Sequence, residues 1–181
     1  MTTAAVRDLL VELGADRIGH AGGSLLAHLT RTSERLADWG ASTELQTVGL
    51  AHALYGTDGF GQSLLGRDER DRLREVAGEP VESQVYLYAS CGRDRTYPHL
   101  ADRPTVLFHD RFAGTDVELE AFSLRTFAEL TAANELDVVL HLEGAGDEHR
   151  AWLLDLVTRM RDLLTDAAWF DCANHLADPA G

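Results

Sequence analysis

Two histidines, His28 and His52, lie 24 residues apart in a stretch whose pattern predicts two helices joined by a very short connection. Such a connection forces consecutive helices to pack side by side and antiparallel. Because His28 lies early in its helix and His52 late in the next, the two imidazoles can face each other. Paired imidazoles are typical of a metal site. A single histidine among alanines and leucines is more often a core or rim side chain bonded to a backbone carbonyl than a ligand, and both interpretations stay open here.

A third group comes from a later helical segment, "NELDVVLH", where Asn134, Asp137 and His141 have i, i+3 and i+7 spacing. This spacing places all three on one helix face. Two imidazoles and one carboxylate suit a divalent Mn, Fe, Zn or Co ion that keeps positions open for substrate and water. We therefore predict His28, His52 and Asp137 as metal ligands, with Asn134 and His141 beside them as groups that orient ligands or contact substrate.

The string "HLTRTSERLADWG" followed by "TVGLAHALYGT" resembles the opening of the HD-domain superfamily of helical metal enzymes. The resemblance covers about residues 16 to 142 and matches at His28, His52 and Asp137. It implies an all-α, HD-domain-like helical bundle with a metal site. Within that superfamily, "GLAHALYGT" and "ELTAANELD" resemble a bacterial family of unknown function. The resemblance therefore implies a fold and a cofactor but no particular reaction.

One position departs from the superfamily pattern, because Ala53 stands where the second histidine is normally followed by an aspartate. A second cation needs nearby negative charge to offset its desolvation, so losing this carboxylate argues against a dinuclear site. We expect a mononuclear site instead. His20, eight residues before His28, is the best candidate for a replacement ligand or catalytic group.

The segment "YGTDGFGQS" carries three glycines directly after the second histidine and could cover the mouth of the site. Asp58 in this segment is a candidate catalytic base for a metal-bound water, and Tyr55 is a candidate substrate contact. The alternative for Asp58 is a solvated turn residue.

The segment "CGRDRTYPH" is the most polar loop-like stretch, and its Arg93 and Arg95 could bind a carboxylate or phosphate on a substrate. Surface ion pairs with the many acidic residues are the alternative for both arginines. The roles of His99 and His109 cannot be read from the sequence.

The hydrophobic pattern predicts a single helical domain over residues 1–176, followed by a disordered tail at 177–181. A small irregular or hairpin insertion is expected around residues 92–117. Ser24 is a candidate helix cap, and Thr43 with Gln46 has capping-box spacing. Helices are expected over 3–13, 24–39, 43–55, 66–78, 79–91, 118–142, 147–164 and 166–176.

The 181-residue chain has a formal charge of −14, which disfavours nucleic acid and anionic membranes as partners. No apolar run is long enough to cross a bilayer, and the first residues do not resemble a secretory signal, so we expect a cytoplasmic location. Cys91 and Cys172 match no metal-binding or redox motif and are expected to be free thiols. The expected partner is a small-molecule substrate, and a homodimer is left open.

Three functions follow from these observations. The first is a mononuclear metal-dependent hydrolase acting on a small metabolite, phosphorylated or not. The second is a non-heme iron oxygenase that uses the same two histidines and one aspartate. The third is a catalytically inactive HD-like domain that binds a small molecule or a protein, and Ala53 is its main support.

Overall fold

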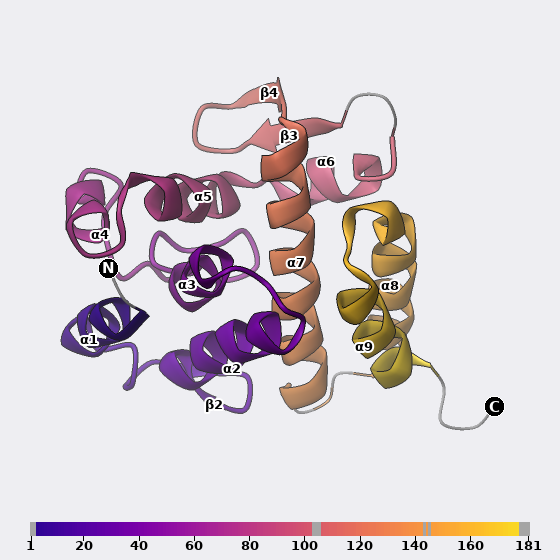
Figure 1. Cartoon of the computed structure of the whole chain (residues 1–181), viewed down its shortest axis with the longest axis horizontal. Coiled ribbons are helices and arrows are strands. Elements are labelled where there is room, and N and C mark those ends of the chain that lie inside the picture. Colours follow the sequence, from indigo (N-terminus) through magenta and orange to yellow (C-terminus); the bar gives the residue numbers. More distant parts are fainter. Residues whose placement is uncertain (1–2, 103–105, 143, 145, 178–181) are drawn as a thin grey trace.

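The computed structural model describes residues 3–102, 106–142, 144 and 146–177, and these residues are mostly helical (Figure 1). The predicted all-α class is therefore confirmed in its coarse form, with two small antiparallel strand pairs added. The helices are α1 (Thr3–Glu12), α2 (Leu25–Asp38), α3 (Thr43–Ala51), α4 (Arg70–Ala77), α5 (Glu79–Ser90), α6 (Arg93–Thr96), α7 (Ala121–His141), α8 (Asp147–Arg159) and α9 (Asp166–Leu176).

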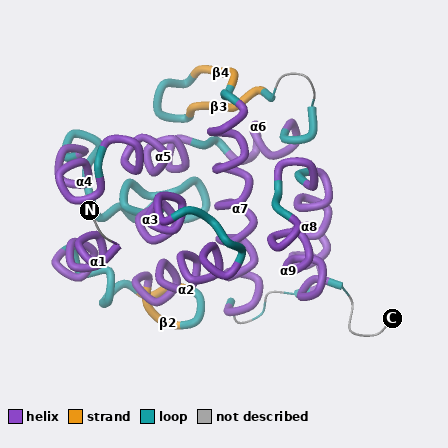
Figure 2. The backbone as a smooth tube through the Cα atoms, viewed as in Figure 1, coloured by secondary structure: helices purple, strands orange, loops and turns teal. Residues whose placement is uncertain are grey.

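Helix α7 is the centre of the fold. It is 21 residues long and contacts α2, α3, α5, α8 and α9, so that most of its length is enclosed (Figures 1 and 2). Buried residues occupy nearly every face of it, which is the pattern of a helix surrounded by other helices rather than one lying on a surface. Its buried polar residues therefore need partners from the neighbouring helices.

The turn between α2 and α3 brings the two predicted histidine helices together. Gly40 follows the end of α2, and its φ of +78° is a left-handed conformation that favours glycine; Ala41 N–H then donates to the Leu36 carbonyl. Gly49 lies so close to α2 that an added Cβ would be 2.5 Å from Leu36 Cδ1. The two helices therefore pack at short range, as the short connection predicts.

Side-chain caps fix where both helices begin. Ser24 Oγ accepts from the Ala27 N–H at 3.2 Å, which confirms the predicted cap of α2. Helix α3 is capped instead by Ser42, which accepts from the Leu45 N–H at 3.2 Å. The capping-box prediction with Thr43 was wrong by one position, because Thr43 is already the first helical residue.

The insertion is partly helical. The segment after Cys91 was expected to be a loop, but it forms α6 and a single 3₁₀ turn over Tyr97–His99. The predicted hairpin is confirmed as β3 (Leu107–Asp110) paired with β4 (Thr115–Glu118). Residues 103–105 lie outside the described part of the chain.

A second, very small strand pair precedes α2 and was not predicted. It joins β1 (Gly19–His20) to β2 (Gly23–Ser24), and it places His20 directly before the N-terminus of α2. Gly22 between the strands has a φ of +68°. The predicted tail lies outside the described residues except for Ala177.

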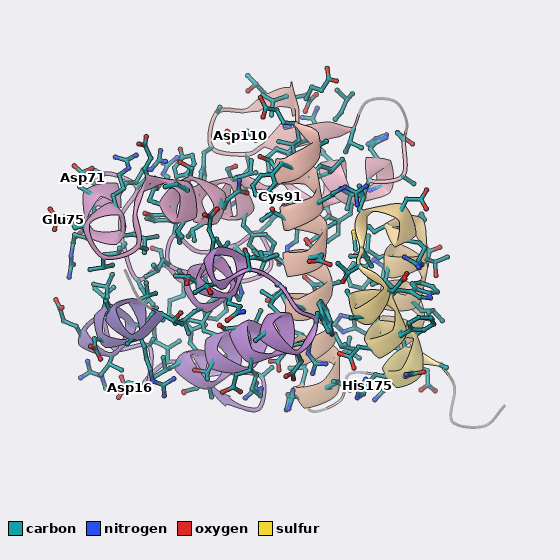
Figure 3. The ribbon with its side chains drawn as sticks, in the orientation of Figure 1. Asp16, Asp71, Glu75, Cys91, Asp110 and His175 are labelled. Carbon is teal, nitrogen blue, oxygen red and sulfur yellow. The ribbon has the colours of Figure 1, made fainter. Side chains whose placement is uncertain are left out.

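Both cysteines are free, as predicted, and both are buried; Cys91 is labelled close to Asp110 in Figure 3. Burial raises the pKa of each thiol to about 12, so neither is a reactive thiolate at neutral pH. No helix within the described ranges is long and apolar enough to cross a membrane.

Candidate functional site

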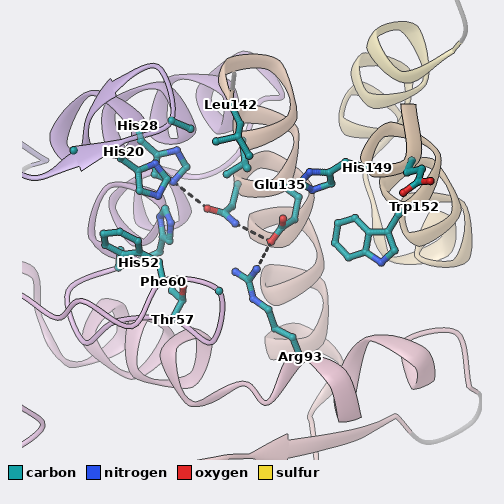
Figure 4. A pocket seen from close by; sticks show the side chains of 17 residues that line it. His20, His28, His52, Thr57, Phe60, Arg93, Glu135, Leu142, His149 and Trp152 are labelled. Carbon is teal, nitrogen blue, oxygen red and sulfur yellow. Dashed lines mark hydrogen bonds and ion pairs between the residues drawn. The ribbon is translucent and has the colours of Figure 1, made fainter. Parts of the chain in front are cut away.

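A cavity of about 930 Å³ lies where α2, α3, α6, α7 and α8 meet (Figure 4). One side of it is polar and carries three imidazoles, an asparagine, a glutamate and an arginine. The other side carries aliphatic and aromatic side chains from the end of α7 and from α8, while Phe60 from the turn after α3 lies beside His20. The volume is in the range of small-molecule sites, which run from roughly 300 to 1,000 Å³.

The imidazoles of His20, His28 and His52 form a compact cluster on the polar side (Figure 4). The rings of His20 and His28 are stacked with centroids 4.2 Å apart, and those of His28 and His52 meet edge to face at 5.3 Å. The structure thus brings together the two histidines singled out by their spacing, and the candidate replacement ligand joins them.

Asp137 lies behind His28, on the far side from the cavity. Its Oδ2 accepts from the Nδ1–H of His28 at 2.7 Å and from Arg31 Nη2 at 2.8 Å, while its Oδ1 accepts from Arg31 Nε at 2.7 Å. Burial alone would raise the pKa of Asp137, but the hydrogen bonds from His28 and Arg31 outweigh burial and lower it to about 2. Asp137 is therefore an ionised carboxylate with both oxygens in use.

The other ring nitrogen of His28 faces α7. Its Nε2–H donates to Asn134 Oδ1 at 3.0 Å, and Asn134 Nδ2 in turn donates to Glu135 Oε1 at 3.0 Å. The same Glu135 oxygen is 2.7 Å from Arg93 Nη1. Because both partners of His28 are acceptors, both of its nitrogens carry a proton in this arrangement, and the ring is an imidazolium.

These contacts join six side chains into one continuous chain of hydrogen bonds, which we call the polar row. Figure 4 shows its cavity-facing part as dashed lines. Its charges alternate in sign along the row, so that every charged member has a neighbour of opposite charge. The row consists, in order, of Arg31, Asp137, His28, Asn134, Glu135 and Arg93.

His52 differs from His28 because it is held as a neutral ring. Its Nδ1–H donates to the Gly49 carbonyl at 2.7 Å. Burial, with the nearby charge of His28, lowers the pKa of His52 to about 3. Its Nε2 therefore keeps a lone pair, and no described residue hydrogen-bonds to that nitrogen. The core-histidine interpretation is met, since the ring is fixed by a backbone carbonyl. The same ring lines the cavity, so a functional role stays a prediction.

His20 is also neutral. Burial is the largest cause that lowers its pKa to about 4, and the charge on His28 adds to the effect. Its Nδ1 is buried and has no hydrogen-bond partner within the described residues. A buried polar atom without a partner is rare enough in native proteins to indicate a missing ligand or water.

The pKa of His52 predicts how stability depends on pH. The unfolded chain protonates this histidine near its ordinary pKa of 6.5, whereas the folded protein does not until about pH 3. Between these values the unfolded state binds more protons. The free energy of unfolding therefore decreases as the pH is lowered, by up to about 1.4 kcal/mol per pH unit. Urea unfolding from pH 7 to pH 4 should show this slope in addition to that from His20, and His52→Gln should remove the part that His52 contributes. The same change at the half-exposed His175 should leave the slope as it is, and equal slopes in all three proteins would refute the assignment.

The donor atoms do not fit the predicted metal site. Both oxygens of Asp137 and both nitrogens of His28 already have protein partners, and Asp137 does not line the cavity. Across the described residues, no group of three His, Cys, Asp or Glu side chains could hold a metal ion. The predicted ligands come together, but only His52 and His20 have a nitrogen to spare. Metal binding therefore stays a prediction.

About half of the chain is similar to a family already defined, and the match covers the elements that carry the imidazole cluster. Residues 9–93 match the family model of a domain of unknown function, DUF6817. No curated protein matches the chain. The DUF6817 match includes His20, His28, His52 and Arg93 but ends before α7, so it covers only one side of the cavity. It agrees with the resemblance to an uncharacterised family, while membership of the HD-domain superfamily stays a prediction.

Within the DUF6817 match, the segment predicted to be a lid is a closed turn. The backbone groups of Thr57 and Phe60 hydrogen-bond to each other in both directions, at 2.8 and 3.0 Å. Asp58 Oδ2 accepts from the Arg93 backbone N–H at 2.8 Å, which fixes the turn to the start of α6. Asp58 is exposed and faces away from the cavity lining, so the structure places this candidate base as a turn residue.

Some of the other predicted substrate contacts line the cavity, and others lie elsewhere in the structure. Arg93 and Asn134 line the cavity. Arg95 forms an exposed ion pair with Asp116 at 2.8 Å, as its alternative interpretation expects. Tyr55 donates to Glu82 at 3.2 Å, outside the cavity.

Apart from His149, the remaining histidines lie outside the cavity lining. His141 Nδ1–H donates to the Asp137 backbone carbonyl at 2.9 Å, one helical turn back. His99 and His109, whose roles were left open, are each 2.7 Å from a carboxylate, that of Asp102 and Asp116 respectively.

Two groups of cavity residues were missed by sequence reasoning. Glu135, Val138 and Leu142 form an i, i+3, i+7 stripe on α7 that lines the cavity next to the stripe that was recognised. Glu135 lies between Asn134 and Asp137, and this nearby acid was the available signal. Trp152 and His149 come from α8, and nothing in their spacing relates them to the histidine helices.

Proposed function

We propose that the chain binds a small organic molecule in this cavity and needs no metal ion to do so. One observation carries the proposal. The carboxylate bonded to the imidazole cluster, Asp137, is bound on both oxygens by Arg31 and His28, while His52 lines the cavity and its Nε2 has no hydrogen-bond partner among the described residues. The site therefore offers a hydrogen-bond acceptor to a ligand rather than a ligand set to a cation.

In a metal hydrolase or an iron oxygenase built on His28, His52 and Asp137, the hydrogen bonds that now occupy Asp137 and His28 would have to break before a metal could bind. Freeing Asp137 separates a buried carboxylate from Arg31, and breaking a buried ion pair typically costs about 3–5 kcal/mol. Freeing His28 Nε2 also removes its bond to Asn134. Metal binding would have to offset both losses, which is why the binding proposal is preferred.

The proposal is tested by thermal unfolding of chelator-treated protein against a library of small metabolites. Library members that bind are expected to raise the Tm, since a ligand at a hundredfold its Kd stabilises by about 2.7 kcal/mol. Val138→Phe, which reduces the cavity, should abolish the shift, whereas Val117→Phe on the exposed strand β4 should retain it. No shift without metal, followed by a shift once Zn²⁺ or Mn²⁺ is added, would contradict the proposal.

An enzyme that uses acid–base chemistry is a second candidate, favoured by the contact of 2.7 Å between Asp137 and His28 Nδ1. A carboxylate in this position fixes the orientation of an imidazole and stabilises its protonated form. His28 lines the cavity and could donate a proton to a bound molecule. Ligands found in the screen should then be converted by the wild-type chain, as seen by mass spectrometry, but not by His28→Gln. Binding without conversion would contradict the enzymatic candidate and leave ligand binding as the function.

A further inference from the structure

We propose that the cavity selects an uncharged, planar molecule that carries a hydroxyl or N–H group, and that this group donates to Nε2 of His52. The inference rests on the proposed function, because it names the class of ligand for the same cavity. Three independent features support it, namely the pairing of charges, the free acceptor and the shape of the walls.

The first feature is the pairing of charges around the cavity. Arg93 is the only arginine or lysine among the described lining residues, and it is 2.7 Å from Glu135. An anionic ligand would have to compete with Glu135 for this guanidinium. It would also lie in the cavity that Glu148 lines. Transferring an anion out of water without a free cation to receive it is strongly unfavourable.

A cationic ligand meets the opposite obstacle. Two acids line the cavity, and one of them, Glu148, is exposed to solvent. The buried one, Glu135, already has Arg93 on one side and the amide of Asn134 on the other. The imidazolium of His28 also lies in the same wall. Because the polar row is balanced internally, a ligand of either charge would leave one charge buried without a partner.

The second feature is the acceptor itself. His52 Nδ1–H is committed to the Gly49 carbonyl, so the tautomer is fixed and Nε2 can only accept. A site that presents a fixed acceptor discriminates strongly against analogues without a donor, because the acceptor would then be desolvated without a partner.

The third feature is the shape of the opposite wall. Trp152 from α8 lines this wall, and its ring stands 5.5 Å from that of His149 (Figure 4). Phe60 meets the His20 ring edge to face at 4.9 Å on the other flank. Flat aromatic and imidazole rings on both flanks favour a planar ring system, which stacks on them with little loss of conformational freedom. A phosphorylated metabolite, which the sequence left open, is disfavoured by the pairing of Arg93 with Glu135.

The test measures the binding of three probes to the chelator-treated full chain. They share a planar naphthalene ring and differ in one substituent: 2-naphthol, 2-methylnaphthalene and 2-naphthyl phosphate. The naphthol should bind at least about tenfold more tightly than the hydrocarbon, which corresponds to about 1.4 kcal/mol for the hydrogen bond. The affinity of the naphthol should exceed that of the phosphate by a larger factor. Trp152 fluorescence and calorimetry give the Kd of each probe.

The variant His52→Leu should reduce the preference for naphthol over the hydrocarbon to less than about twofold. The matched change His175→Leu, on the exposed side of α9, should leave the preference as it is. If His52→Leu does not fold, the ¹⁵N signal of His52 Nε2 in the wild-type protein replaces it. That signal should shift with naphthol and stay in place with the hydrocarbon.

The outcomes separate this inference from the proposed function. Tighter binding of naphthyl phosphate by metal-free protein would overturn the inference and leave the proposed function standing. Equal affinity for naphthol and the hydrocarbon would overturn it in the same way. Binding of any of the probes only after metal is added would overturn both.

Discussion

Replacing Asp137 with asparagine is expected to destabilise the metal-free protein by about 3–5 kcal/mol. The change keeps the shape of the side chain but removes the charge that holds Arg31 and His28. Arg31 would be left beside a neutral amide, and the imidazolium of His28 would lose its closest acceptor. Urea unfolding of chelator-treated protein gives the difference directly.

The chain contains a matched control for this change. Asp171 on α9 is bound by Arg35, which lies one turn after Arg31 on α2, and His175 follows it at the spacing that His141 has from Asp137. Asp171 is about a quarter exposed, whereas Asp137 is fully buried. Asp171→Asn should therefore cost only about 1–2 kcal/mol.

The same comparison separates an internal ion pair from a metal site. A carboxylate kept to bind a cation repels its neighbours when the cation is absent, so its removal should leave metal-free protein equally or more stable. A stability of Asp137→Asn equal to or above that of the wild type, without metal, would contradict the arrangement described here.

Replacing Glu82 with glutamine is expected to cost about 3–5 kcal/mol. Glu82 is fully buried, and its carboxylate accepts from Arg70 at 2.5 and 2.8 Å, from Arg74 at 3.1 Å and from the Tyr55 hydroxyl at 3.2 Å. These bonds join the segment after α3 to α4 and α5, so one neutral amide would leave Arg70 without its carboxylate partner and Arg74 with Asp71 alone. Thermal and urea unfolding measure the loss.

Controls for this prediction come from the same region. Glu79→Gln, at the exposed start of α5, should change stability by less than about 0.5 kcal/mol. Tyr55→Phe should cost about 1 kcal/mol, the value of a hydrogen bond, and leave ligand binding unchanged. Weaker ligand binding by Tyr55→Phe with unaltered stability would instead support a substrate contact for this tyrosine, as the sequence alone predicts.

The pairing of His28 with His52 could be predicted because it depends on local geometry. Helix periodicity and a short connection are both legible in a sequence, and together they determine which faces meet. The same reasoning placed Asn134 and Asp137 on the helix face that meets His28. It could not say which ring nitrogen each would contact, because that depends on a shift of a few ångströms between α2 and α7.

Arg31 could not be predicted as the partner of Asp137. The two residues are 106 positions apart, and an arginine on an amphipathic helix normally indicates a solvated face. Arg31 occupies both oxygens of the Asp137 carboxylate, which a metal ion would need as a ligand. This contact therefore determines what the site can bind. Long-range ion pairs of this kind leave no periodic pattern in either helix.

The short helix α6 was missed for a different reason. Four residues are too few to show a hydrophobic period, and its start is fixed by the Asp58 carboxylate from a distant turn. Arg93 was nevertheless recognised as a functional candidate from its charge. The structure adds that its guanidinium is paired with Glu135 on the cavity wall.

The most direct test of the central claim is the ¹⁵N spectrum of histidine-labelled, chelator-treated protein, recorded before and after addition of Zn²⁺. His52 should give the signals of a neutral ring with a protonated Nδ1 and a free Nε2, and His28 those of a ring protonated on both nitrogens. We expect both sets to be unchanged by stoichiometric Zn²⁺. A joint shift of the His28 and His52 signals that saturates at one equivalent of Zn²⁺ would contradict the account and identify a metal site.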